Sequence, residues 1–155
     1  MTSALKSTLT EDMKNAMRAQ AKDKLATIRM ILAAIKQREI AARVDGVVEL
    51  TDEDILDILV KMVKQRRESI ALYDTGNRPD LADIEKAEIE IIQTYLPSPL
   101  TDSEIESLIQ QAIADTGAVS IKDMGKVVAQ LRPLVQGRAD VGKVSNKVKD
   151  RLTAN

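Results

Sequence analysis

The chain has 155 residues, a formal net charge of −1 and a hydrophobic fraction of 44%, which suit a folded protein of one domain or two small ones. It contains no cysteine and no histidine, which excludes a disulfide framework, a thiolate nucleophile, a Ser-His-Asp triad and a Cys/His zinc site. Its only aromatic residues are Tyr73 and Tyr95, so the core must be aliphatic, and aliphatic residues at helical spacing predict an all-α fold.

The first two predicted helices are defined by apolar periodicity. Apolar residues recur every three or four positions from Ser3 to Gln20 and again from Asp23 to Arg43, so each segment has one apolar face. Asp45-Gly46 is a turn signal that ends the second helix. The apolar face of the first helix is predicted to contain Leu5, Leu9, Met13, Ala16 and Met17.

Capping signals define the third and fourth helices. Thr51 has the form of an N-cap, and the acids after it suit the positive end of the helix dipole. Gly76-Asn77 ends the third helix, as expected for a residue that adopts positive φ, and Pro79 suits the first turn of the fourth. The residues expected to face inward on the fourth helix are Ile84, Ala87, Ile91 and Tyr95.

The segment Leu96-Pro97-Ser98-Pro99-Leu100 is the clearest boundary in the chain. Two prolines within three residues cannot continue a helix, and each forces its predecessor toward an extended conformation. We therefore expect a helical N-terminal domain of about four helices over residues 1–96 and a three-helix C-terminal domain over residues 97–155. A domain this small is near the lower limit for independent folding, so its stability is expected to be modest.

Three short helices are predicted after this boundary. Thr101 and Glu104 form a capping box for the first of them, and Gly117 closes it. Ser120 is expected to cap the second, which Pro133 should kink or end. The residues expected to face inward on this second helix are Ile121, Met124, Val127, Val128 and Leu131.

The last helix follows a turn at Gly137-Arg138-Ala139-Asp140, in which Asp140 can serve as the N-cap. The charge of this region differs from that of the rest of the chain. Residues 120–155 carry 8 basic and 3 acidic side chains, whereas residues 1–96 carry 15 basic and 17 acidic ones. The C-terminal end is therefore locally cationic.

A set of short motifs in a fixed order extends over nearly the whole chain. The motifs are Leu25–Met30, Lys64–Ile70, Ala87-Glu88-Ile89, Tyr95-Leu96-Pro97, Lys122–Val128, Leu131-Arg132-Pro133, Gly137-Arg138-Ala139-Asp140 and Val144 to Val148. The ordered set resembles the GatB/YqeY family. The chain is similar to stand-alone YqeY-like proteins, whose last part resembles the tail domain of GatB, a component of the aspartyl/glutamyl-tRNA amidotransferase.

The resemblance implies a tRNA-associated, tRNA-binding accessory protein, because the helical tail of GatB helps to hold the tRNA. The family label is carbon–nitrogen ligase activity with glutamine as amido-N-donor. The chain has no segment with the length and composition of the GatB catalytic domain, and no Gly/Ser-rich amidase stretch. We therefore expect no catalytic residues and no cofactor, and rank an amide-transfer enzyme below a binding protein.

Lysine and arginine attract RNA because they neutralise phosphates and release counterions, and a folded RNA is recognised largely by its shape and backbone. The residues predicted to contact RNA are Lys126, Arg138, Lys143 and Lys147. The motif residues with a structural role are Gly125, Gly137 and Asp140, of which the two glycines permit close backbone approach. The alternative interpretation is an ordinary solvated helix face, with the glycines serving helix packing and capping. Stacking on single-stranded bases is not expected, since this region has no aromatic residue.

A second functional hypothesis is a protein-interaction adaptor whose N-terminal domain docks on a synthetase or on part of an amidotransferase. A second group of basic residues has two interpretations. It could extend an RNA-binding face, or its members could form salt bridges with acids on a solvent-exposed helix face. This group comprises Lys61, Lys64, Arg66 and Arg67.

Several other properties are expected from absences in the sequence. The acids at positions 52–54 and 57 are interpreted as partners of the helix dipole, so no metal site is expected. The chain has no apolar stretch long enough for a leader or a membrane span, which predicts a cytoplasmic protein with no membrane association. A monomer is favoured.

Overall fold

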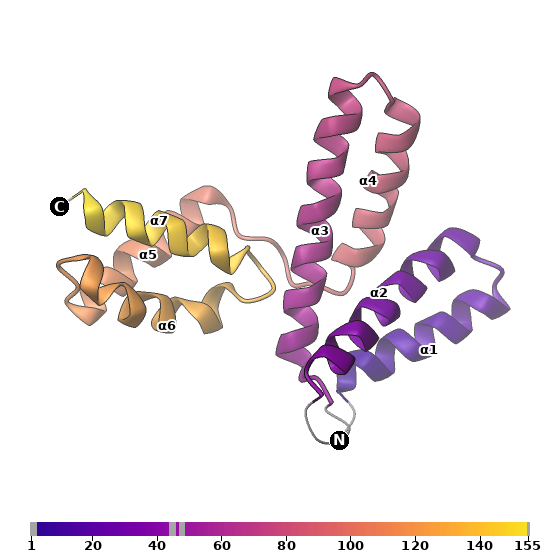
Figure 1. The fold of residues 1–155 in the computed structure, drawn as a ribbon, viewed down its shortest axis with the longest axis horizontal. Helices are drawn as coiled ribbons and strands as arrows, with labels where there is room; N and C mark the ends of the chain where they lie inside the picture. Colours follow the sequence, from indigo (N-terminus) through magenta and orange to yellow (C-terminus); the bar gives the residue numbers. More distant parts are fainter. Residues whose placement is uncertain (1–2, 44–45, 47–48, 155) are drawn as a thin grey trace. The chain divides into compact units, whose positions relative to one another are not determined.

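The computed structural model describes residues 3–43, 46 and 49–154. Over these residues it contains seven α-helices, one short 3-10 helix and no strand, so the predicted all-α fold is confirmed (Figure 1). The contacts between residues divide the chain into two compact units, and the division falls between Pro97 and Ser98. Each unit has its own hydrophobic core.

The N-terminal unit consists of two helical hairpins (Figure 1). Helices α1 (Ala4–Arg18) and α2 (Lys22–Ala41) form the first, and α3 (Asp52–Thr75) and α4 (Pro79–Gln93) form the second. Part of the turn predicted at Asp45-Gly46 lies outside the described residues. The core is aliphatic, and its largest fully buried side chains are Leu9, Ile28, Ile31, Ile35, Ile55, Leu59 and Ile92.

Local polar contacts set the ends of the second hairpin. The Thr51 hydroxyl accepts a hydrogen bond from the Asp54 N–H at 3.2 Å, and the Asp54 carboxylate accepts from the Thr51 N–H at 3.0 Å, which completes a capping box. The positive φ expected where α3 ends falls on Asn77, at 56°, whereas Gly76 has a φ of −82°. Pro79 occupies the first turn of α4, as predicted.

In the N-terminal unit, three residues that the sequence placed on inward faces are exposed, and those predictions are wrong. Met17 is 50% exposed and Ile84 is 56% exposed, and Ala87 is exposed as well. On α4 the fully buried residues are Ala82 and Ile92. α4 packs mainly against α3 and also contacts α2, and the face that carries Ile84 and Ala87 is exposed to solvent.

The C-terminal unit contains α5 (Asp102–Thr116), the 3-10 helix η1 (Ile121–Asp123), α6 (Met124–Val135) and α7 (Val141–Thr153). As predicted, Thr101 and Glu104 form a capping box at the start of α5, and Gly117 ends it in the left-handed conformation, with a φ of 67°. The buried core contains Ile105, Ile109, Ala112, Ala118, Val127, Leu131, Val135, Val144, Val148 and Leu152.

Pro133 neither ends nor interrupts α6, which continues to Val135. Proline cannot donate a backbone hydrogen bond, so the Ala129 carbonyl loses its usual partner within the helix. Both Ala129 and Pro133 lie on the exposed side of α6, where that carbonyl can bond to water instead. The cost of the proline is therefore small here, and the helix survives one more half-turn.

The start of the second C-terminal helix also differs from the prediction. Ile121, which was expected to face inward, is 46% exposed in η1. The Asp123 carboxylate accepts hydrogen bonds from the N–H groups of Val119 and Ser120 at 3.0 and 3.3 Å, and these bonds hold the pKa of Asp123 below its usual range. A short 3-10 turn therefore precedes α6, and this turn places Ile121 at the surface.

The two glycines Gly117 and Gly125 provide a matched test of backbone conformation. An added Cβ would meet no atom within 4 Å at either position, but only Gly117 has a positive φ. We predict that Gly117→Ala lowers the free energy of unfolding by about 1–2 kcal/mol, because the left-handed conformation is unfavourable for residues with a Cβ. Gly125→Ala should raise it by about 0.4–1 kcal/mol by restricting the unfolded chain. Urea unfolding followed by circular dichroism measures both changes, and effects of the same sign would contradict this account.

Candidate nucleic-acid interface

The four predicted RNA-contacting residues lie on α6, on the turn before α7, and on α7, and they differ in what surrounds them. Lys126 and Lys143 are exposed, and neither forms an ion pair with any residue that the structure describes. Lys126 lies close enough to Asp123 to contribute to the lowered pKa of that carboxyl group. These two lysines therefore present their charge to solvent.

Arg138 is instead part of the scaffold. Its Nε donates a hydrogen bond to the Ser98 carbonyl at 2.9 Å, and its own carbonyl accepts one from the Leu100 N–H at 2.9 Å. The backbone N–H of Arg138 donates to the Val135 carbonyl, also at 2.9 Å. Arg138 thus joins the first residues of the C-terminal unit to the turn between α6 and α7, and one N–H of its guanidinium is already engaged.

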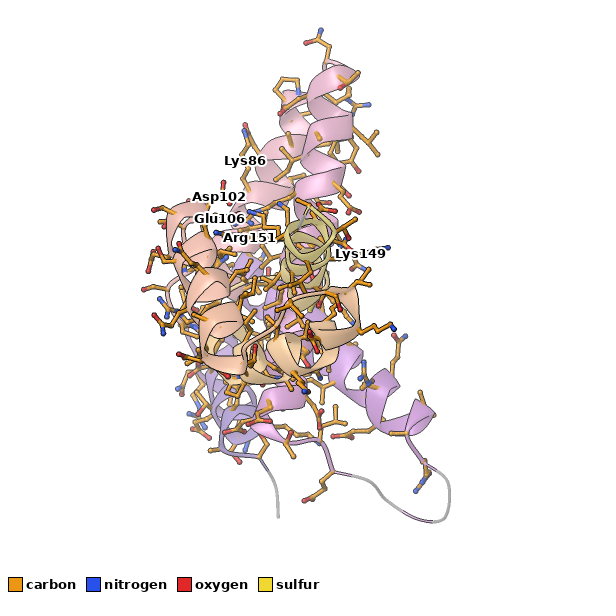
Figure 2. All side chains as sticks on the ribbon, turned by 90° about the vertical axis from the view of Figure 1, so that its left-hand side faces the viewer. Lys86, Asp102, Glu106, Lys149 and Arg151 are labelled. Carbon is orange, nitrogen blue, oxygen red and sulfur yellow. The ribbon has the colours of Figure 1, made fainter. Side chains whose placement is uncertain are left out.

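Lys147 belongs to an ion-pair cluster between α5 and α7. Its Nζ lies 3.6 Å from Asp102 Oδ1 and 4.0 Å from Glu106 Oε1, and Arg151 Nη1 lies 3.0 Å from Glu106 Oε2. The labelled side chains of Asp102, Glu106 and Arg151 gather on one side of α7 (Figure 2). Lys147 shares a helical face with Lys143 by spacing, but its charge is largely compensated by α5.

The three motif residues have different surroundings. Gly125 lies in open space, so no neighbouring helix makes the close approach that the sequence suggested for it. Gly137 is buried and has a φ of 75°, which favours glycine at this turn. Asp140 caps α7 by accepting a hydrogen bond from the Gly142 N–H at 3.0 Å. Gly137 and Asp140 therefore shape the turn, whereas Gly125 leaves the α6 surface open.

Other exposed cations of this unit were not among the predicted contacts. Lys122, Arg132 and Lys149 are exposed, and no ion pair is described for any of them. Figure 2 shows Lys149 on the opposite side of α7 from Arg151. The signal that could have found Lys149 is its spacing, because a residue two positions after Lys147 lies on a different face of the helix.

The second basic group is divided in the same way. Arg66 Nε lies 2.8 Å from Glu88 Oε2 and 4.0 Å from Glu85 Oε2, and its side chain is only 12% exposed. Lys61 and Arg67 are exposed. Arg66 therefore joins α3 to α4: it is paired with acids, as the salt-bridge interpretation expects, but its partners lie on another helix and it is not on a solvent-exposed face.

The acids at the start of α3 have a structural use. Asp52 accepts a hydrogen bond from the Leu5 N–H at 3.1 Å and another from the Ser3 hydroxyl, and these bonds lower the pKa of Asp52. Within the described ranges, no three His, Cys, Asp or Glu side chains are grouped to hold a metal ion. No helix in the same residues is both long and apolar enough to cross a membrane.

These features define a small all-α protein with a cationic three-helix unit at its C-terminal end. The family model described as Yqey-like protein matches residues 6–152. The chain therefore belongs to the YqeY-like protein family, and the resemblance inferred from its ordered motifs is confirmed in that respect.

Curated relatives carry the name Altered inheritance of mitochondria protein 41, mitochondrial. The one from Vanderwaltozyma polyspora is 37% identical over 122 residues, which cover 75% of this chain and 64% of the relative. The one from Clavispora lusitaniae is 42% identical over 102 residues, which cover 65% of this chain and 57% of the relative. The one from Pyrenophora tritici-repentis is 31% identical over 150 residues, which cover 94% of this chain and 80% of the relative.

Two findings follow from these relatives. The chain spans less than two thirds of the length of the first two relatives. All three relatives are named as mitochondrial proteins, which contradicts the expectation of a cytoplasmic location. That expectation rested on the lack of an apolar leader in the printed sequence, and this criterion does not detect every targeting signal.

The scaffold role of Arg138 can be separated from ligand binding by its effect on stability. Arg138→Ala should lower the free energy of unfolding by about 0.5–1.5 kcal/mol, because it removes the hydrogen bond to the Ser98 carbonyl. Lys143→Ala should change it by less than about 0.5 kcal/mol, because Lys143 is exposed and has no described partner. Chemical denaturation of the full chain measures both, and equal effects would contradict the assignment.

The Glu104 cap predicts a dependence of stability on pH. Glu104 accepts a hydrogen bond from the Thr101 N–H at 3.1 Å, and this bond, more than the Thr101 hydroxyl or the nearby Arg138 charge, holds the pKa of Glu104 below its usual 4.5. The unfolded chain therefore binds the proton more readily, so stability present above pH 4.5 is lost as the pH falls through the native pKa.

Glu104→Gln should make the acid-side decline in melting temperature shallower. Thr101→Ala is the control, because it removes the hydroxyl and keeps the backbone N–H that contributes most to the pKa shift. A decline that is unchanged in Glu104→Gln would show that the cap is not the cause.

Proposed function

We propose that this protein binds tRNA through the cationic surface of its C-terminal unit and acts as an accessory protein rather than as an amide-transfer enzyme. The observation that carries the proposal is the set of exposed cations on α6 and α7 without described ion pairs, on a unit that resembles a tRNA-holding tail. Such cations retain the full charge that phosphate neutralisation requires.

The division of the cations between scaffold and surface supports this proposal. Arg138 donates to the Ser98 carbonyl, and Lys147 lies within ion-pair distance of Asp102 and Glu106 on α5. Binding to phosphate would then fall mainly to cations that are free of such partners. The proposed contacts are Lys126 and Lys143, and the other exposed cations of this unit are Lys122, Arg132 and Lys149.

The kind of RNA recognition follows from the chemistry of this surface. It contains no aromatic side chain, because Tyr73 and Tyr95 both precede the C-terminal unit. Recognition would therefore depend on backbone phosphates and on the shape of a folded RNA rather than on base stacking. A tRNA fits these requirements, and its handling by a related tail domain is the reason for proposing it over other folded RNAs.

The test is the salt dependence of tRNA binding by the full chain. Lys126→Glu and Lys143→Glu should each weaken binding, since each removes about one phosphate contact. The plot of log affinity against log salt has a negative slope, and each variant should reduce the magnitude of this slope by about one unit. Fluorescence anisotropy with labelled tRNA over a series of salt concentrations measures the slope.

Lys36→Glu is the matched control, because it makes the same charge change at an exposed position of α2 in the N-terminal unit. This control should leave the slope unchanged. If the unmutated chain shows no salt-sensitive binding of tRNA, or if Lys36→Glu has the same effect as Lys143→Glu, the proposal fails.

A further inference from the structure

The outer face of α4 carries an apolar stripe that is largely exposed. Ile84, Ala87 and Ile91 are spaced by three and four residues, so they share one face of the helix. Ile84 is 56% exposed, Ala87 is exposed and Ile91 is half-buried. The side of α4 that packs against α3 is a different one, marked by the buried Ala82 and by the ion pair of Glu88 with Arg66.

The stripe leads into an open pocket at the C-terminal end of α4. The pocket has a volume of about 560 Å³, and Ile91 belongs both to its lining and to the stripe. Its other lining residues come from α1, α2 and the end of α4, and they are Thr8, Asp12, Lys24, Glu90, Thr94 and Tyr95. Ile91 therefore connects the apolar stripe to this pocket, whose lining also carries charged side chains.

A tyrosine–aspartate pair sets the chemistry of the pocket. The Tyr95 hydroxyl donates a hydrogen bond to Asp12 Oδ2 at 2.6 Å, which holds this carboxylate at the pocket wall. Burial, together with this hydrogen bond and the Asp12 charge, raises the pKa of Tyr95, so the hydroxyl remains a donor at neutral pH. One of the two aromatic rings of the chain thus lies beside a fixed negative charge, an arrangement that suits a cation.

The charges of the lining favour the same kind of ligand. Asp12 and Glu90 supply two carboxylates, and Lys24 supplies one ammonium group, so the pocket has a net negative charge. Asp12 is bonded to a neutral hydroxyl, and no ion pair is described for Glu90, which leaves both carboxylates able to meet a cation. RNA phosphate would be repelled here.

We propose that this surface is a docking site for an amphipathic helix of a partner protein, which lays apolar side chains on Ile84 and Ala87 and inserts a lysine or arginine between Asp12 and Glu90. The stripe from Ile84 to Ile91 is about 10 Å long, which matches about two turns of such a helix. Docking of an amphipathic helix on an apolar groove is a recurring mode of recognition, with one charged residue fixing its direction. The site is independent of the RNA-binding surface proposed above, because it lies wholly in the N-terminal unit.

Site-specific photocrosslinking in the native cells tests the proposal with the full chain. A benzoylphenylalanine placed at Ala87 should crosslink to a partner, and mass spectrometry of the crosslinked peptide should show an amphipathic segment with a lysine or arginine about one helical turn from the attachment point. The same crosslinker at Leu72 is the matched control, because Leu72 is an exposed apolar residue on α3, at 73% exposure, outside the stripe.

Charge reversal then tests the pocket itself. In the chain that carries the crosslinker at Ala87, Glu90→Lys should lower the yield of this crosslink about tenfold, whereas Lys86→Glu on the same helix should not lower it. Circular dichroism confirms that each variant is folded. No crosslink, or a crosslink to RNA, to a second copy, to the protein's own C-terminal unit or to an acidic segment, would overturn the proposal. Each of these outcomes is distinguishable from loss of tRNA binding.

Discussion

The buried core of each unit consists of aliphatic side chains, and this constraint affects much of the remaining structure. Without Phe or Trp, each helix contributes only medium-sized residues such as Ile109 and Leu131, and each of these stabilises the fold by about 1.5–3 kcal/mol when fully buried. The C-terminal unit is small, so few such residues are available. Polar contacts at its edges, such as the Arg138 hydrogen bond to Ser98, add to what this core supplies.

Some basic side chains of the C-terminal unit are paired with acids of the same unit, and others are exposed to solvent. Lys147 and Arg151 join α7 to α5, whereas Lys143 and Lys149 on the same helix are exposed to solvent. A count of basic residues therefore overstates the charge that is available to a phosphate. The N-terminal unit shows the same division, because Arg66 is committed to Glu88 between α3 and α4.

The two units also differ in the chemistry of their free surfaces. The C-terminal unit offers exposed lysines, which suit a polyanion, whereas α4 offers an apolar stripe next to the carboxylates of Asp12 and Glu90. These surfaces would attract different classes of partner because their charges are opposite. A protein that carries both could join an RNA to another protein, and the two proposals can be tested separately.

Rules that act within a few residues predicted the seven α-helices of the described residues and several of their ends, but not the 3-10 turn before α6 or the continuation of α6 past Pro133. The Thr51 and Thr101 capping boxes and the left-handed Gly117 form because all the atoms involved lie within one turn of the chain. The observed division of the chain also falls within the Pro-Ser-Pro segment. The exposure of Ile84 could not be predicted in this way, because an apolar face shows where a neighbour could pack and not whether one does.

The functional roles of the basic residues depended on the tertiary structure for the same reason. Arg138 meets the carbonyl of a residue 40 positions earlier, and Arg151 meets Glu106, 45 positions earlier. No local pattern encodes these contacts, since they exist only when the C-terminal unit is folded. Composition and spacing were enough to show that the C-terminal unit is helical and cationic, whereas the packing of its helices decided which cations stabilise the fold and which remain free to bind.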